Sequence, residues 1–159
     1  MTRLAFSKKD NYTRCMNSAI YSLAMREHSR QEIYNKLSHK DFSDGVDINA
    51  LLDELEEKNY LNDNRFTECF IRSRSQRGQG VNKITNDLRQ RGITPQLISR
   101  ALNESNIDWY EMANKQREKK FGKSKPINYK EKARQMRFLF NRGFDAEIIR
   151  SVCSTTSLV

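Results

Sequence analysis

The chain has 159 residues and a formal net charge of +9, from 29 Lys and Arg against 20 Asp and Glu, and its hydrophobic content is 36%. So low an apolar content argues against one large shared core and favours several small helical cores in a row. No apolar run approaches the roughly 20 residues that a membrane span requires, and the N-terminal stretch MTRLAFSKKDNY lacks the apolar core of a secretory signal. We therefore expect a cytoplasmic protein that has no membrane partner.

Helix start and stop signals recur along the chain and divide it into nine helices. Two residue pairs have the spacing of a capping box: Ser29 with Glu32, and Asn128 with Glu131. Thr94 followed by Pro95 is typical of an N-cap and a first helical residue. Further candidate N-caps are Asp47, Asp63, Asp108 and Asp145, and candidate left-handed helix stops are Asn59, Gly92, Gly122 and Gly143. Since runs of alternating β-branched or aromatic residues are missing, the sequence predicts an all-α fold.

The predicted helices repeat in threes with a period of 51 residues. The segments KLSHKDF (36–42), DLRQRGI (87–93) and FLFNRGF (138–144) superpose without a gap and align Leu37, Leu88 and Leu139. Such a period predicts three tandem three-helix, helix-turn-helix-like repeats that stack end to end, bury their apolar stripes on each other and form an elongated, curved body. We assign the parts of the chain as a flexible N-terminus at 1–10, repeats at 11–61, 62–107 and 108–153, and a flexible tail at 154–159.

The stretch from Asn59 to Gly80 begins as an amphipathic helix and ends in a basic turn. One face of this helix carries Phe66, Cys69 and Phe70, and its end carries Arg72, Arg74 and Arg77. Gly78 and Gly80 flank a single residue, whereas a P-loop has four residues between its glycines, and a dinucleotide fingerprint needs a third Gly and a preceding strand. We interpret the segment as a helix-to-helix turn in which glycine lets the backbone reverse and approach a neighbour or a partner.

No arrangement of side chains predicts a catalytic or metal site. The carboxylates of DELEE, at 53–57, are interpreted as a solvated acidic helix face, and His28 and His39 are predicted at the surface because their neighbours are polar. The three cysteines are far apart and predict reduced, mostly buried thiols. Cys69 lies on the Phe66 stripe and is expected to matter more for stability than Cys15. We expect a protein that is not an enzyme and holds no metal or other cofactor.

The excess positive charge lies in the last two thirds of the chain. Residues 1–61 carry 9 basic and 10 acidic side chains, residues 62–107 carry 8 and 4, and residues 108–159 carry 12 and 6. Basic residues on folded helices are expected to bind phosphate groups with salt-dependent, sequence-independent affinity, although a surface that is basic only for solubility is the alternative. The candidate contact residues are Arg72, Arg74, Arg77, Lys83, Arg89, Arg91, Lys115, Arg117, Lys119, Lys120, Lys123, Lys125, Lys132, Arg134 and Arg142.

The segment LEEKNYLNDNRFTECFIRSRSQRGQGVNKITNDLRQRGI resembles the RecX family of bacterial regulatory proteins. The signature of that family contains Gly-Tyr-Leu-Asp-Asp-x-Arg-Phe, followed by a basic turn with glycine. Upstream, AIYSLAMREHSRQEIYNKL is similar to the first repeat of the family, and downstream IDWYEMANKQREKKFG and QMRFLFNRGFDAEII are similar to the third. The resemblance covers about residues 12–153. Asn59 and Asn62 replace Gly and Asp of the signature, and Asn suits both a left-handed and an N-cap position.

The resemblance implies three tandem three-helix repeats and a non-enzymatic modulator of the RecA recombinase. It further implies that the protein lies in the groove of the RecA filament on DNA, where it limits the ATPase, strand-exchange and coprotease activities and so modulates recombinational repair and the SOS response. Arg65 and Phe66 match the signature. We assign Phe66 to the core and leave Arg65 between an internal ion pair and a partner contact.

Two other functions are left open by the residues themselves. One is a plain, non-specific helical DNA-binding module, and the other is a helical-repeat adaptor for an acidic protein. A sequence-specific reader presents a recognition helix with side chains aimed at base edges and usually dimerises, and no helix here stands out for that role. We expect a monomer that binds single-stranded and duplex DNA weakly and without specificity, and that binds a RecA filament better.

Overall fold

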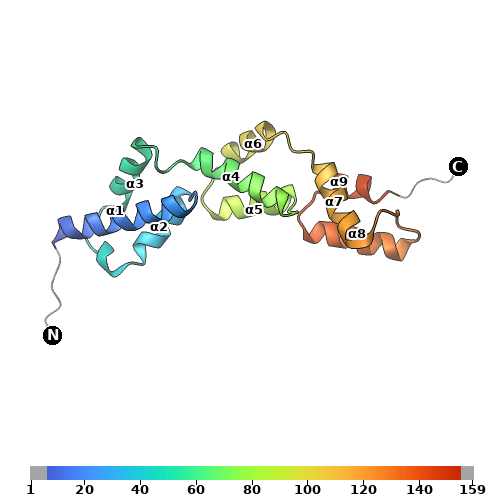
Figure 1. The fold of residues 1–159 in the computed structure, drawn as a ribbon, viewed down its shortest axis with the longest axis horizontal. Helices are drawn as coiled ribbons and strands as arrows, with labels where there is room; N and C mark the ends of the chain where they lie inside the picture. The colour runs from blue at the N-terminus through green and yellow to red at the C-terminus, as the bar shows by residue number, and fades with distance from the viewer. Residues whose placement is uncertain (1–6, 155–159) are drawn as a thin grey trace.

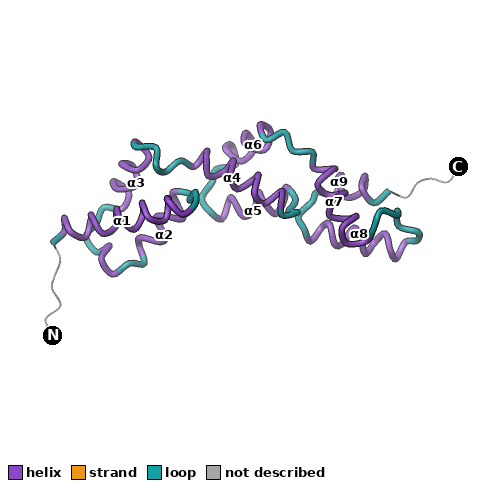
Figure 2. The backbone as a smooth tube through the Cα atoms, in the orientation of Figure 1, coloured by secondary structure: helices purple, strands orange, loops and turns teal. Residues whose placement is uncertain are grey.

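The computed structural model describes residues 7–154, and every regular element in that range is helical (Figures 1 and 2). Nine α-helices and a 3-10 turn at Asp41–Ser43 occur there. The helices are α1 (Lys8–Met25), α2 (Arg30–Ser38), α3 (Ile48–Glu57), α4 (Asp63–Gln76), α5 (Val81–Gln90), α6 (Pro95–Glu104), α7 (Trp109–Phe121), α8 (Tyr129–Asn141) and α9 (Ala146–Val152). They form three units, α1–α3, α4–α6 and α7–α9, which we call repeats 1, 2 and 3. The units follow one another along an elongated body (Figure 1), so the expected architecture is confirmed.

Each repeat encloses a hydrophobic core of its own. Leu37, Leu88 and Leu139, which mark the 51-residue period, are fully buried, one in each of the three cores. The expectation that neighbouring repeats bury apolar stripes on each other is wrong, because the three helices of a repeat already enclose their own stripes. Trp109, at the start of α7, packs against the cores of both repeat 2 and repeat 3. The several small cores that the composition favours are therefore present.

Most helix starts agree with the predicted caps. Thr94, Asn128 and three of the four predicted aspartates accept a hydrogen bond from the third residue of their helix, and Ser29 with Glu32 forms a reciprocal capping box. Asp63 is the exception. The N-cap of α4 is Asn62, whose Oδ1 accepts a hydrogen bond from the Arg65 amide at 3.0 Å. The four predicted left-handed stops all have positive φ angles.

The first helix begins earlier than predicted. α1 starts at Lys8, where Ser7 and Asp10 form a capping box with each other, so residues 8–10 are helical and not part of a flexible N-terminus. The remainder of the expected flexible ends, at 1–6 and 155–159, lies outside the described residues.

Repeats 1 and 2 meet through hydrogen bonds at the start of α2. The hydroxyl of Ser29, the N-cap of α2, donates to the carbonyl oxygen of Arg91 at 2.8 Å. One residue further along, the amide of Arg30 donates to the carboxylate of Asp63 at 2.8 Å, which explains why Asp63 does not cap its own helix. Gly92 lies against the side chain of Gln31. The start of α2 therefore rests on the corner between α5 and α6.

The hydrogen bonds that join repeats 2 and 3 at the equivalent place are between backbone groups. The Gly80 amide, at the N-cap of α5, donates to the carbonyl oxygen of Arg142 at 2.8 Å, and the Asn82 amide donates to that of Gly143 at 2.8 Å. A Cβ on Gly80 would lie 2.3 Å from the backbone nitrogen of Phe144. In both junctions the second helix of one repeat starts against the Arg-Gly corner of the next repeat.

Candidate polyanion-binding surface

A cleft of about 440 Å³ opens between repeats 1 and 2 and collects arginine side chains from three helices and their flanks. Arg74 and Arg77 reach it from the C-terminal end of α4, where Arg77 is the C-cap. Arg26 comes from the end of α1, and Arg91 from the end of α5. The junction between the repeats thus brings together arginines that are up to 65 positions apart in the chain.

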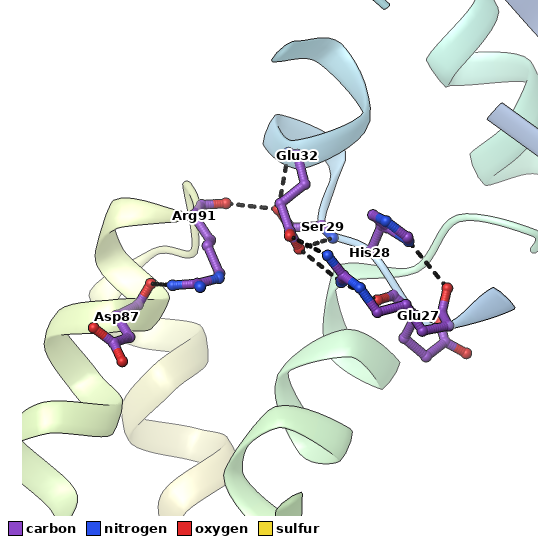
Figure 3. A network of polar contacts seen from close by, with 7 residues as sticks. Glu27, His28, Ser29, Glu32, Asp87 and Arg91 are labelled. Carbon is purple, nitrogen blue, oxygen red and sulfur yellow. Dashed lines mark hydrogen bonds and ion pairs between the residues drawn. The ribbon is translucent and has the colours of Figure 1, made fainter. Parts of the chain in front are cut away.

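The ring of Phe70 holds two of these guanidinium groups in place. The guanidinium carbon of Arg74 lies 4.8 Å from the ring centroid, and that of Arg91 lies 5.0 Å from it. Arg91 also donates from Nη1 to the carbonyl oxygen of Asp87 at 2.9 Å, while its own carbonyl accepts the Ser29 hydroxyl (Figure 3). The backbone of Arg91 thus joins the repeats, while Phe70 and the Asp87 carbonyl orient its guanidinium in the cleft.

The acidic side chains of the cleft are already occupied. Glu27 pairs with Arg65, and Glu32 pairs with Arg26 at 2.9 Å. Burial opposes the ionisation of Glu32, but the hydrogen bonds from Arg26 and from the Ser29 backbone outweigh burial and lower the pKa of this carboxyl. Across residues 7–154, no carboxylate lies within ion-pair distance of Arg74 or Arg77. The cleft consequently has an excess of positive charge that can receive an anionic group.

Arg72 does not share this cleft, although it was expected on one surface with Arg74 and Arg77. Two residues along a helix correspond to a rotation of about 200°, so Arg72 points to the other side of α4. There it lines a separate cleft of about 530 Å³ between α4, α6 and Met112 of α7, together with Glu68 and Glu104. Its Nη2 lies 3.4 Å from the sulfur of Cys69. The surroundings of Arg72 are of mixed charge, unlike those of Arg74 and Arg77.

The other candidate residues are distributed over repeats 2 and 3. The exposed ones are Arg77, Lys83, Arg89, Lys115, Lys119, Lys120, Lys123 and Arg134, and the half-buried ones are Arg74, Arg91, Lys125, Lys132 and Arg142. Some already have partners. Lys115 pairs with Glu111 at 2.9 Å, and Lys125 donates to the carbonyl oxygen of Val152 at 2.9 Å. Lys120 and Arg142 both lie about 5 Å from the ring of Phe138.

Arg117 must be removed from the set of contact candidates. Its side chain is only 1% exposed, because α7 directs it into repeat 3. There the guanidinium donates to the Asn114 side chain at 3.2 Å and to the carbonyl oxygen of Ser124 at 3.1 Å. Arg117 thereby fastens the segment between α7 and α8 and cannot reach a partner.

Arg65 forms an internal ion pair, one of the two roles left open for it. Its Nε donates to the carboxylate of Glu27 in repeat 1, and its Nη2 donates to the carbonyl oxygens of Asn59 and Tyr60 at 3.1 and 3.3 Å. These contacts tie α4 to the end of α1 and to the linker before α4. The signature arginine thus stabilises the first junction.

The histidines and cysteines differ in part from prediction. His39 is exposed as expected, but His28 is buried at the first junction, where Nδ1 lies 3.0 Å from the carbonyl oxygen of Arg26 and burial lowers the pKa of the ring. Cys15 and Cys153 are fully buried, and burial raises the pKa of both thiols, whereas Cys69 is only half-buried. Burial thus argues against the expected ranking of Cys69 above Cys15 for stability. No helix among residues 7–154 has the length and apolar character of a membrane span.

Three family models match successive parts of the chain. They describe the first, second and third three-helix domains of RecX and match residues 15–55, 62–102 and 106–153. Regulatory protein RecX of Halorhodospira halophila is 38% identical over 138 residues, which cover 87% of this chain and 85% of that protein. Regulatory protein RecX of Salmonella heidelberg is 37% identical over 155 residues, which cover 92% and 93%.

Two crystal structures have the same fold. RecX from Lactobacillus salivarius matches with a TM-score of 0.72 at 21% identity and covers 91% of this chain and 95% of that chain. A second structure, of regulatory protein RecX, matches with a TM-score of 0.76 at 18% identity and covers 91% and 73%. The row of three helical units is therefore shared with solved structures.

Proposed function

Because this chain belongs to the RecX family of regulatory proteins, we propose that it binds the RecA filament on DNA and inhibits the ATPase, strand-exchange and coprotease activities of the recombinase. Inhibition of these activities modulates recombinational repair and the SOS response. The regulator acts as a cytoplasmic monomer, by binding and without catalysis or a cofactor of its own.

The arginine cleft between repeats 1 and 2 is the observation that carries this proposal. A filament on DNA presents phosphate groups and acidic protein surface to a protein bound along it. Arg74 and Arg77 have no acidic partner among residues 7–154, and the ring of Phe70 holds the guanidinium groups of Arg74 and Arg91 before any ligand binds. Because these side chains are already ordered before a ligand binds, little conformational entropy is lost on binding. Most of the interaction energy therefore contributes to affinity.

The experiment reverses the charge of the cleft and compares inhibition of RecA ATPase on single-stranded DNA. The double variant Arg74→Glu/Arg77→Glu removes two charge-assisted contacts, each contributing roughly 1.5 to 3 kcal/mol, so the inhibitory concentration should rise at least about a hundredfold. Arg72→Glu alone should have a much smaller effect, because Arg72 lines the other cleft. Both variants leave Phe66, Phe70 and Leu88 in place, so helicity by circular dichroism should stay at the wild-type level.

Lys8→Glu/Lys9→Glu is the matched control, since it makes the same total change in charge at exposed positions of repeat 1. It should inhibit like wild type. A folded Arg74→Glu/Arg77→Glu variant that inhibits at the wild-type concentration would remove the cleft from the contact surface. If Arg74→Glu/Arg77→Glu lowers the affinity for bare duplex DNA, for bare single strands and for filaments by the same factor, the plain DNA-binding module is the better description of the protein.

A further inference from the structure

The outer face of α8 carries two large aromatic side chains that the rest of residues 7–154 leaves uncovered. Tyr129, at the first position of the helix, is 90% exposed, and Phe140, near its end, is 69% exposed. Neither ring takes part in an aromatic pair within residues 7–154. Other aromatic residues of repeat 3 do find partners, as Phe121 and Phe138 do, with ring centroids 5.4 Å apart. Tyr129 and Phe140 therefore remain available to a ligand.

The two rings lie in one row along the helix. Phe140 follows Tyr129 by eleven residues, which at 100° per residue returns to within about 20° of the same direction after three turns. The rise of 1.5 Å per residue separates the two positions by about 16 Å. Between them the same row contains Ala133, which is small and exposed, and Met136, which is half-buried and packs against the core of repeat 3. Space is thus left between two flat apolar surfaces.

A second row, of cations, runs beside the aromatic row. Lys130 and Arg137 are seven residues apart, so they share a direction, and they lie about 80° to 100° around the helix from the aromatic row. Both are exposed, and no carboxylate among residues 7–154 lies within ion-pair distance of either. Arg134, further around the helix, has Glu131 at 3.5 Å. Lys130 and Arg137 do not belong to the candidate residues named from the sequence.

Two parallel rows, one aromatic and one cationic, match the chemistry of a single-stranded nucleic acid. Every base has an apolar face that can stack on an aromatic ring, and every nucleotide has a phosphate that a cation can neutralise. In a duplex each base is stacked between neighbouring bases, so its faces are not available to stack on Tyr129 and Phe140. A second copy of this chain, which also carries a net charge of +9, would be repelled by the cationic row.

We propose that the outer face of α8 binds single-stranded nucleic acid, with Tyr129 and Phe140 stacking on unpaired bases and Lys130 and Arg137 contacting the phosphate backbone. The strand runs along the helix axis, and the small Ala133 leaves room for the nucleotides between the two stacked bases. This inference deepens the proposed function and rests on it for the setting, a filament assembled on single-stranded DNA. The single strand would thus bind to a surface of repeat 3 that is separate from the arginine cleft between repeats 1 and 2.

The test measures binding of the full chain to a fluorescein-labelled oligo-dT strand, and to a duplex of equal length, over a range of salt concentrations. Tyr129→Ala/Phe140→Ala should weaken binding of the single strand by about a hundredfold, with about tenfold for each lost base. Its salt dependence should stay unchanged, because no phosphate contact is removed. Lys130→Ala/Arg137→Ala should instead lower the slope of log K against log salt by about 1.4, since each phosphate contact on a single strand contributes about 0.7.

Two controls separate stacking from other effects. Tyr129→Phe/Phe140→Tyr keeps both rings and should bind like wild type. Tyr21→Ala/Tyr60→Ala removes two other exposed tyrosines, 68% and 54% exposed and both in the first 61 residues, and should also bind like wild type. Unchanged binding of the single strand by a folded Tyr129→Ala/Phe140→Ala variant would overturn the proposal. An equal loss for single strand and duplex would overturn it too, because stacking requires unpaired bases.

Filament assays with the same variants distinguish this proposal from the proposed function. If wild type inhibits RecA but Tyr129→Ala/Phe140→Ala keeps full affinity for oligo-dT, only the stacking surface is wrong. If the aromatic variant loses affinity for oligo-dT but wild type does not inhibit RecA, the stacking surface stands and the proposed function fails.

Discussion

Cys15 and Cys69 are both free thiols, but they have different surroundings. Cys15 is fully buried in the core of repeat 1, where its thiol makes a long hydrogen bond of 3.9 Å to the carbonyl oxygen of Phe42. Cys69 is half-buried on α4, beside the guanidinium of Arg72. A thiol is close to apolar in its packing, whereas a hydroxyl needs stronger hydrogen bonds, which the half-buried position of Cys69 supplies more easily than the core around Cys15.

We expect Cys15→Ser to lower the free energy of unfolding by about 1 to 3 kcal/mol, because it buries a hydroxyl far from a good partner. Cys69→Ser should change the free energy of unfolding by less than about 0.5 kcal/mol, as is usual away from the core. Urea unfolding followed by circular dichroism measures both values. Equal losses for the two variants would show that the burial difference has no energetic effect.

At the scale of single residues, the sequence predicts those features that depend only on neighbouring positions in the chain. The aligned leucines and the capping pairs follow from helical periodicity and from the free amides at a helix start, which short segments already define. Arg117 and His28 are buried by the packing of the folded chain, although the carbonyl groups that they contact, those of Ser124 and Arg26, lie only seven and two positions away. No local signal distinguishes Arg117 from the exposed Lys119 and Lys120.

The elements that join the repeats are helix starts and Arg-Gly corners. Gly80 has φ and ψ angles of −87° and 170°, which other residues adopt easily, so its role is close approach and not backbone freedom. Gly143, its partner across the junction, has a φ of 91° and lies with its backbone against Lys83. The sequence predicted a close approach at Gly80, but its partner, 63 positions further on, could be identified only from the fold.

Gly80→Ala should open the junction between repeats 2 and 3. The added Cβ would meet the backbone of Gly143 and Phe144 at 2.3 to 2.5 Å, and backbone cannot turn aside as a side chain can. Loss of the two amide hydrogen bonds, at about 0.5 to 1.5 kcal/mol each, should speed hydrogen exchange at position 80 and at Asn82 by about ten- to a hundredfold. Each repeat keeps its own core, so helicity should not change.

Gly122→Ala is the matched control for that substitution. A Cβ at Gly122 meets no atom within 4 Å, although its φ of 86° makes the substitution somewhat strained. Exchange at position 80 and at Asn82 should therefore stay at the wild-type rate in this variant. Protected amides in Gly80→Ala would show that the junction can absorb a methyl group.

The whole molecule ends in two repeats that cannot extend the row. Repeat 1 has Asp41 where the other repeats have the glycine of the Arg-Gly corner. At the other end, the 51-residue period relates Ser29 and Gly80 to Glu131, but α8 already begins at Tyr129 with Asn128 as its N-cap. The additional residues occupy the place where another corner would have to rest. Atypical terminal units are a common way for repeat proteins to avoid open-ended assembly.

We therefore expect a monomer at all moderate concentrations, with a mass of 18.7 kDa by light scattering after size-exclusion chromatography. High salt should not change this mass, because closed ends and not charge repulsion alone prevent assembly. A dimer that forms as salt is raised would contradict the role of Asp41 and of the extended α8.

The separate cores of the three repeats also have a kinetic consequence. Because the repeats are joined by a few hydrogen bonds, the Arg65–Glu27 ion pair and the packing of Trp109, and not by a common core, we expect that one repeat can leave a long, regular partner while its neighbours remain attached. The detached repeat is then held at a high effective concentration near its own binding site and rebinds before the others are released. On the proposed filament we therefore expect three weak attachments in a row to give a long residence time, and a competitor that occupies a vacated site to remove the protein stepwise from one end.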